Sequence, residues 1–360
     1  MKNLAFICFF AFQGLITHVI FPVPPYLLFF SLACVFVIAS RAKTVQLNAW
    51  TVFLLLFSFL YFLLSQVVLE VEVKRLIPIL LQFVILIFML SITQIDKNLY
   101  QKTLIFLLVS SVVIFFLDTV WRLTHPELER IGVNIDQGEF AYLYAFKSNS
   151  LIYSDTNVMA IHLLCLMFFF VVAKQLGKLK VRNIWLWTLG VLIIFTFSRA
   201  GIISMLLGLL LIYFQKMNII FKVVFFIFGI FGIVWSLGTF DFTSFEDGSF
   251  RSKLFIFDNF LSYLEVQTAE SFLFGNGLYQ SNKATGIYSH NLLIVLYVET
   301  GIFGFIFYLS YLGVLVNHAG KKFLYVLFPV LLASMGGALL SFPLLYSSAH
   351  LLNDKTLKTD

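Results

Sequence analysis

Two arginines and one histidine have the types and positions best suited to chemistry in this chain. Arg199 interrupts the apolar sequence FTFSRAGIISMLLG, Arg251 lies near the start of GSFRSKLFIFDNFLSYL, and His290 directly precedes a long apolar run. A charge within an apolar segment is costly, so such residues are candidates for function. A guanidinium has planar donors that match phosphate oxygens in pairs. The arginines therefore predict binding of a phosphate-bearing ligand.

His290 is the candidate for proton transfer. Ser289 is suited to cap the helix that follows, which would place His290 in the first helical turn. The positive end of the helix dipole disfavours an imidazolium there, so we expect the ring to stay neutral near pH 7. A neutral imidazole is what a general base requires.

A purely structural interpretation exists for each of these residues. Arg199 could extend its side chain to lipid headgroups or cap a helix, and Arg251 and Lys253 could anchor a helix at the membrane surface. A lone histidine at an interface is also common. The same holds for the aromatic side chains of FAYLYAFK, which suit either sugar stacking or an interfacial belt: Phe140, Tyr142, Tyr144 and Phe146.

Five further polar residues could support the three candidates. Asn291 follows His290, and Glu299 lies within the same apolar run, where it could orient a partner or pair with a buried arginine. Ser289 precedes them. Asp155 and Asn157 lie where another apolar segment begins and could bind sugar hydroxyls. Near Glu299, Gly301 and Gly304 would let a neighbouring helix approach closely.

The elements that must position these residues are membrane helices. Of the 360 residues, 61% are hydrophobic and 12% are charged, and the mean hydropathy is +0.97. Apolar runs recur at about the length needed to cross a bilayer. We therefore predict an all-α polytopic membrane protein with 11 or 12 spans, the last of which is long enough to be two short helices: 4–20, 26–40, 48–68, 76–95, 103–121, 156–173, 184–198, 200–214, 219–238, 290–316 and 323–350.

Arg199 separates two apolar stretches that we expect to be too short to cross the membrane separately. Each has about 15 residues and would form a helix of about 22 Å, whereas the hydrocarbon core is about 30 Å thick. The two helices would then be short and re-entrant, or Arg199 would lie below the outer membrane surface.

Charge sets the orientation. The short connections are rich in Lys and Arg, as in KQLGKLKVR at 174–182, whereas the long connections are acidic. Basic loops face the cytoplasm, so the long loops face outward. The expected order is N-terminal helices, a first outward loop, central helices broken at Arg199, a second outward loop, and C-terminal helices with a tail: 1–121, 122–155, 156–238, 239–289 and 290–360. Long loops are usually functional.

The second outward loop contains a predicted amphipathic helix. Its apolar residues recur every three or four positions on one helical face: Phe250, Leu254, Phe257, Leu261 and Leu264. We expect this helix to lie on the outer membrane surface.

Several functional classes lack a signature in this sequence. It has no glycine-rich phosphate loop, zinc motif or nucleotide fingerprint, and Cys8, Cys34 and Cys165 all lie in apolar runs. We therefore expect no metal and no other cofactor. The net charge of +6 follows membrane topology and is not clustered on a domain, so no nucleic-acid partner is expected.

In their order, these motifs resemble the superfamily of O-antigen polymerases and O-antigen ligases. The resemblance rests on SRAG, the arginine that begins the outer helix, FGNGL, and SHNLLIVLYVETGIFGFIFYL, and is specific over 185–316. It is weaker over 122–160, where SDTNVMA is similar to the family's Asn-bearing element. By position, Arg199, Arg251 and His290 match the two arginines and the histidine of the family.

The resemblance implies a metal-independent, inverting glycosyltransferase of the membrane-embedded GT-C class. Such enzymes take a glycan from undecaprenyl diphosphate at the outer face of the bacterial cytoplasmic membrane. Arg199 and Arg251 would bind the diphosphate, and His290 would deprotonate or orient the acceptor hydroxyl. A chain-length regulator and a flippase of the same pathway would be its partners.

Polymerase is favoured over ligase, because the compact, Phe-rich and divergent chain suits an enzyme specific for one repeat unit. A ligase would instead transfer the glycan to lipid A-core. The alternative from another class is a flippase for the same lipid-linked units. A transporter would predict polar sites at the midplane and internal repeats, and neither is evident in the sequence.

Overall fold

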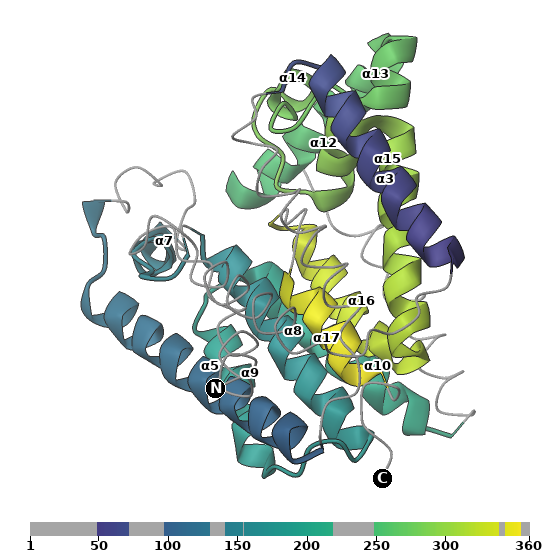
Figure 1. Ribbon diagram of the computed structural model, residues 1–360. Helices are drawn as coiled ribbons and strands as arrows, with labels where there is room; N and C mark the ends of the chain where they lie inside the picture. Colours follow the sequence, from purple (N-terminus) through teal and green to yellow (C-terminus); the bar gives the residue numbers. More distant parts are fainter. Residues whose placement is uncertain are drawn as a thin grey trace.

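The structure is a computed structural model that describes residues 49–71, 97–129, 141–153, 155–218, 248–337 and 343–353. Every regular element in these ranges is a helix (Figure 1): α3 (Ala49–Val68), α5 (Lys97–Thr124), α7 (Ala141–Lys147), α8 (Thr156–Gln175), α9 (Asn183–Ile194), α10 (Arg199–Lys216), α12 (Gly248–Val266), α13 (Ala269–Phe274), α14 (Asn282–Thr285), α15 (Leu292–Ala319), the 3₁₀ helix η2 (Lys321–Phe323), α16 (Leu324–Ser334) and α17 (Pro343–Leu352).

The prediction of an all-α, multi-pass membrane protein is confirmed for this part of the chain. Four of its helices, α5, α8, α10 and α15, are long and apolar enough to cross a membrane. Helix α3 coincides with the span predicted at 48–68. The spans predicted at 4–20, 26–40, 76–95 and 219–238 lie outside the described residues.

Helix α8 forms the centre of the bundle. Its side chains from Met159 to Phe170 are buried on every face, as expected of a helix that is hydrophobic all round. It contacts α9, α10, α16 and α17 (Figure 1). Small residues permit a close approach, because a Cβ atom on Gly201 of α10 would lie 2.7 Å from the Cβ of Ala160.

Two helix boundaries differ from the sequence prediction, and a predicted division is confirmed. Helix α5 continues to Thr124, so Arg122 belongs to a helix and not to the first outward loop. The second stretch at Arg199 is also longer than predicted: α10 has 18 residues, and by length and composition it can cross a membrane. The long last span is divided, as anticipated, between α16 and α17.

The break in α15 shows why a glycine is required there. Gly301 has φ 66° and ψ −174°, a conformation that side chains other than glycine rarely adopt. A Cβ atom at this position would collide with the carbonyl group of Leu273 at the end of α13. Tyr61 of α3 donates to the carbonyls of Leu273 (3.1 Å) and Thr300 (3.3 Å). The predicted close approach at Gly301 is therefore confirmed.

Gly304 has a different neighbour. A Cβ atom there would meet the side chain of Thr300 in the preceding turn of its own helix. The close approach of a neighbouring helix thus depends on Gly301.

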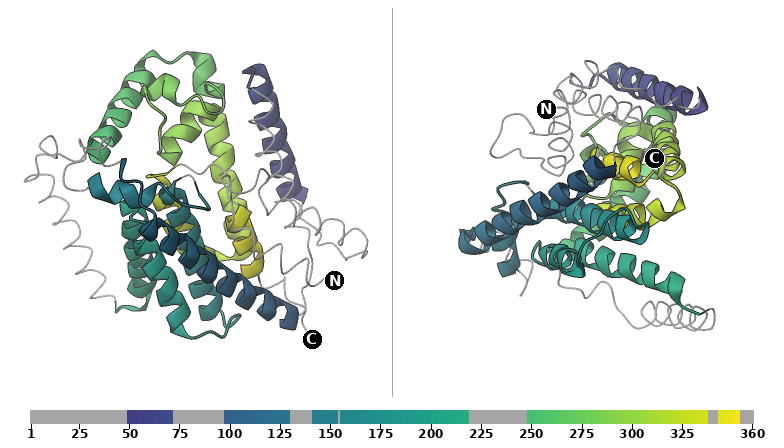
Figure 2. Two further views of the ribbon diagram at one scale, coloured as in Figure 1. Left: turned by 90° about the vertical axis from the view of Figure 1, so that its left-hand side faces the viewer. Right: turned by 60° about the horizontal axis from the view of Figure 1, so that its bottom comes forward.

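The helices place the short lysine-rich connections and the long acidic loops at opposite ends of the bundle. Lys178, which follows α8, donates to the carbonyl of Leu352 at the end of α17, and Tyr100 near the start of α5 donates to Leu351. The end of α5 and the starts of α8 and α10 meet at the other end. There α12, α13 and α14 gather around the first half of α15 (Figure 2). The lysine-rich segments are thereby separated from Arg199.

Candidate functional site

Arg199 occupies the first position of α10, directly after a tight turn. Ser198 caps the helix, since its hydroxyl oxygen accepts a hydrogen bond from Gly201 N at 3.2 Å. The preceding residue, Phe197, has φ 54°, a conformation that is costly for an aromatic residue. The Arg199 side chain is exposed at this end of the bundle. The sequence prediction of a break between two helices at this arginine is correct.

The segments SDTN and SRAG, far apart in sequence, meet at this turn. Asp155 caps α8 by accepting from Asn157 N at 2.8 Å. The Asn157 side-chain oxygen accepts from the hydroxyl of Ser198 at 2.8 Å. This bond joins the starts of α8 and α10, so Asn157 contacts the residue directly before Arg199.

The end of α16 closes the same junction. A Cβ atom on Gly336 would lie 2.6 Å from the Cβ of Ala200, and one on Gly337 would lie 3.0 Å from the Cβ of Asn157. The Gly336-Gly337 pair therefore lets the backbone pass closely over the starts of α8 and α10.

Two lysines share an electrostatic environment with Arg199. Burial lowers the pKa of Lys147, at the end of α7; Asp155 opposes this change, whereas the positive charges of Arg199 and Lys253 add to it. Desolvation and the charge of Arg199 also lower the pKa of Lys253. Thus α7, α10 and α12 each contribute a cation to one cluster, which we call the outer cation cluster: Lys147, Arg199 and Lys253.

Lys147 is the member of this cluster that sequence reasoning missed. Its ammonium lies 5.1 Å from the centre of the Tyr144 ring, and the neighbouring Phe146 ring packs against Phe197 at 6.1 Å. The sequence feature that could have indicated Lys147 is FAYLYAFK, where a single lysine ends an aromatic segment. Of the aromatics proposed for sugar stacking, Tyr144 thus contacts a member of the cation cluster, and Phe146 contacts Phe197, two residues before Arg199.

Helix α12 connects this cluster to the segment that carries His290. The predicted apolar face is exposed, with 37% of Leu254, 50% of Phe257 and 44% of Leu261 accessible, as a helix that lies on a membrane surface requires. Its opposite face packs inward through Ile256. Asn259 also donates to the carbonyl of Thr285 at 3.2 Å.

Arg251 lies in the first turn of this helix, and its side chain is exposed. Lys253, two residues further on, is the α12 residue whose pKa responds to Arg199. The structure therefore connects Lys253 to the outer cation cluster and places Arg251 at the start of the same helix.

His290 lies just before α15 and not in its first turn, which corrects the sequence prediction. Asn291 is the cap: its side-chain oxygen accepts from Leu293 N at 3.0 Å and from Ile294 N at 3.4 Å. Asn caps helices as well as Ser does, so local sequence could not decide between Asn291 and Ser289. Ser289 instead accepts from Asn291 N at 3.2 Å.

The exposed His290 ring has an aromatic neighbour. It packs edge-on against Tyr288, with 6.0 Å between ring centres. Burial raises the pKa of Tyr288, and the charges of Glu299 and Tyr279 raise it further. Tyr288 therefore stays protonated at neutral pH and can donate a hydrogen bond beside His290.

Glu299 is fully buried and fixes the loop that follows α13. Its carboxylate oxygen Oε1 accepts from Ser281 N at 3.3 Å, and its backbone oxygen accepts from Gly277 N at 3.1 Å. Gln66 of α3 supports the same loop by accepting from Leu278 N at 2.8 Å. Ser281 in turn accepts from Ser289 N at 3.4 Å, so the contacts reach the residue before His290.

A polar cavity of about 180 Å³ lies where this loop meets the end of α3. Its polar lining comes from Glu70, Asn276, Gln280 and Lys283. Glu70 in the lining (φ 54°) and Tyr279 (φ 59°), which lies in sequence between the lining residues Leu278 and Gln280, have left-handed backbones. Such backbones are uncommon for these residue types and cluster at functional sites. This cavity offers hydrogen-bond donors and acceptors together.

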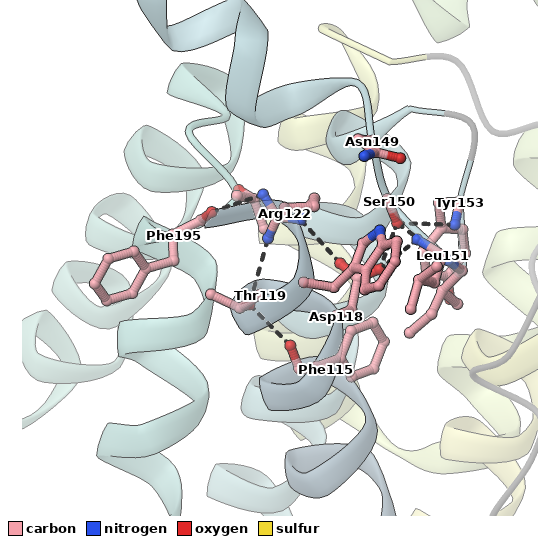
Figure 3. Close-up of polar contacts among 12 residues, drawn as sticks. Phe115, Asp118, Thr119, Arg122, Asn149, Ser150, Leu151, Tyr153 and Phe195 are labelled. Atoms are coloured by element: carbon pink, nitrogen blue, oxygen red, sulfur yellow. Dashed lines mark hydrogen bonds and ion pairs between the residues drawn. The ribbon is translucent and has the colours of Figure 1, made fainter. Parts of the chain in front are cut away.

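An ion pair joins Arg122 and Asp118 within α5 (Figure 3). Arg122 Nε is 2.9 Å from Asp118 Oδ2, and both side chains are fully buried. The sequence analysis missed this pair, although a carboxylate and a guanidinium four residues apart in an apolar segment indicate neighbours on one helical face.

No group of three or more His, Cys, Asp or Glu side chains in the described ranges is arranged to hold a metal ion. No protein-family model matches the chain, and no curated protein is significantly similar to it in sequence.

Proposed function

We propose that this chain is a polymerase of a bacterial surface polysaccharide such as O-antigen. It transfers a growing glycan from undecaprenyl diphosphate to the next lipid-linked repeat unit at the outer face of the cytoplasmic membrane. The observation that carries this proposal is the packing of the Arg199 turn against the end of α7 and the start of α8, through the Phe146–Phe197 ring contact and the Ser198–Asn157 hydrogen bond. The charges of Lys147, Arg199 and Lys253 act on one another at this end of the bundle. Three neighbouring cations suit a ligand with several negative charges, and a diphosphate is such a ligand.

The topology that goes with this function has 11 or 12 spans in a GT-C-like arrangement. The end of the bundle with Arg199 faces outward, and the lysine-rich end faces the cytoplasm. The exposed apolar face of α12 lies in the outer surface of the membrane. This arrangement would bring the diphosphate of a membrane-anchored donor to the level of Arg199.

The reaction is a single displacement at the anomeric carbon of the donor sugar. The acceptor hydroxyl oxygen bonds to that carbon, while the bond from the carbon to the diphosphate oxygen breaks with inversion. His290 takes the hydroxyl proton, and undecaprenyl diphosphate leaves with the electron pair. Arg199, Lys147 and Lys253 stabilise the negative charge that develops on the diphosphate, and Arg251 contributes from the start of α12.

The acceptor sugars would reach His290 from the side of the polar cavity. Its amide, carboxylate and ammonium groups match the mixed donors and acceptors of a saccharide. Gln280 in its wall is next to Ser281, which contacts Ser289. Asn157 and Asp155 lie on the other side, near Arg199, where they suit the donor.

Arg199→Ala and His290→Ala variants test this mechanism in reconstituted membranes. Each should lower the rate of glycan transfer roughly a hundredfold, because one removes a cation from the leaving group and the other removes the base. Only Arg199→Ala should also weaken binding of inorganic pyrophosphate. The exposed Arg182 lies in the lysine-rich segment, so Arg182→Ala is the matched control and should be fully active. Full activity of both test variants would refute the mechanism.

Gene deletion separates the polymerase from a ligase. In a cell that makes lipopolysaccharide, loss of the polymerase leaves a single repeat unit on lipid A-core, whereas loss of a ligase leaves none. Vectorial movement of lipid-linked units without elongation would instead identify a flippase.

A further inference from the structure

The buried Asp118–Arg122 pair has bonds that extend well beyond α5. Isolated buried ion pairs are weak contributors to stability, and apolar residues of similar volume can often replace them without loss. The ion pair in α5 is fully buried in an otherwise apolar helix. The hydrogen bonds that the pair makes to other segments therefore indicate a role besides stability.

The guanidinium of Arg122 joins two other helices (Figure 3). Its Nη1 donates to the carbonyls of Phe146 and Phe195, both at 3.0 Å. Phe146 lies in the last turn of α7, and Phe195 is the C-cap of α9. Carbonyls at helix ends lack partners within the helix, so one arginine satisfies both and holds the two ends together.

The carboxylate of Asp118 fixes a third segment. Its Oδ1 accepts from Ser150 Oγ and from Leu151 N, both at 2.8 Å. The Ser150 hydroxyl oxygen accepts in turn from Ile152 N at 3.2 Å and from Tyr153 N at 3.1 Å. These bonds order the turn that leads into α8.

Each of these three segments continues into a charged residue of the site. Lys147 follows Phe146 directly, Arg199 begins α10 four residues after Phe195, and Asp155 follows the turn at Ser150. Lys147 and Arg199 carry like charges and repel each other. The bonds from Arg122 fix the backbone directly before Lys147 and four residues before Arg199, and the contact between the Phe146 and Phe197 rings adds to this restraint.

We propose that the Asp118–Arg122 pair is a positioning device that sets the spacing of Lys147 and Arg199 and thereby the affinity of the outer cation cluster for a diphosphate. The pair does not touch the ligand. The inference rests on the proposed function, because the ligand of the cluster is taken to be the diphosphate of the glycan donor.

The test replaces the pair with apolar residues of similar size. The double variant Asp118→Leu/Arg122→Met avoids leaving one buried charge alone. Its melting temperature should still fall, because the carbonyls of Phe146 and Phe195 and the N–H of Leu151 lose their partners. Its dissociation constant for inorganic pyrophosphate should rise at least about tenfold. Binding is measured by calorimetry on the full chain in phosphatidylcholine nanodiscs. Ser150→Ala removes one bond to Asp118 and the two bonds that its hydroxyl accepts from Ile152 N and Tyr153 N, and it should raise the constant about threefold.

Tyr100→Phe is the control for a merely structural effect. It removes a buried hydrogen bond to Leu351 at the other end of α5, and it should lower the melting temperature without changing pyrophosphate affinity. Wild-type affinity in both the double variant and Ser150→Ala would overturn the proposal. If the double variant does not fold, Ser150→Ala decides alone.

Two further measurements distinguish a failure of the positioning role from a failure of the proposed diphosphate site. If Arg199→Ala binds pyrophosphate as tightly as the wild type, the proposed diphosphate site fails. If Arg199→Ala loses binding but both pair variants keep it, only the positioning role fails. Adding phosphatidylglycerol to the nanodiscs tests lipid headgroups as the ligand: complete displacement of pyrophosphate would overturn the assignment to the donor.

Discussion

At the scale of single residues, the site is built from contacts between distant segments. Asn157 and Ser198 are 41 positions apart and share a 2.8 Å hydrogen bond, and Arg122 reaches carbonyls 24 and 73 positions away. Sequence reasoning identified Asn157 and Arg199 separately, because each is a polar residue at the start of an apolar segment. It missed Lys147 and Arg122, because their importance comes from neighbours that only the fold brings together.

The lowered pKa of Lys147 predicts a pH dependence of ligand binding. Burial makes this lysine lose its charge at a pH below the ordinary lysine pKa of 10.5. As the pH rises, pyrophosphate affinity should therefore begin to fall at a lower pH than it would with a lysine of ordinary pKa. Arginine stays charged throughout this range. Lys147→Arg should therefore keep its affinity to higher pH than the wild type.

Calorimetric titrations over a series of pH values provide the measurement, with Lys283→Arg as a control that should follow the wild type. If the wild type and Lys147→Arg lose affinity at the same pH, Lys147 does not contribute its charge to the ligand.

At the scale of helices, boundaries and breaks decide where the candidate groups lie. The apolar pattern predicted α8 and α12 well, because a continuous apolar run marks a helix that is buried on all sides and a one-sided apolar face leaves a clear period in the sequence. The start of α15 was less certain, because Ser289 and Asn291 are equally good caps. The unwound position at Gly301 could be suspected from the sequence, but its partner at the end of α13 could not.

The break at Gly301 gives a stability prediction with a matched control. Gly301→Ala should lower the free energy of unfolding by more than about 1 kcal/mol, because its φ of 66° is unfavourable for alanine and the new Cβ would meet Leu273. Gly313 lies in the same helix, and a Cβ atom added there would have no neighbouring atom within 4 Å. Gly313→Ala should be neutral or stabilising by up to about 1 kcal/mol.

Thermal unfolding of the two variants in the same detergent measures the difference. The account of the break would be contradicted if Gly301→Ala were as stable as Gly313→Ala. Because α13 leads into the loop held by Glu299, Gly301→Ala should also lower glycan transfer.

At the scale of the whole molecule, charge and hydropathy indicated the membrane class and the orientation, and the described helices agree with the class. The bundle holds α8 at its centre and places the starts of α8 and α10 beside the end of α5. This arrangement follows from packing between helices, through small residues such as Gly201 and Gly336. Such pairings cannot be read from the period of a single helix, so the assembly of the cation cluster could not be predicted.

Glycan elongation by the purified protein tests the central claim most directly. The full chain is placed in proteoliposomes with a lipid-linked single repeat unit as the only substrate, and the products are separated by size. We predict lipid-linked glycans of two or more repeat units together with released undecaprenyl diphosphate, and neither product with Arg199→Ala. The account would be contradicted if the repeat units crossed the bilayer without elongation, or if transfer occurred only after lipid A-core was added.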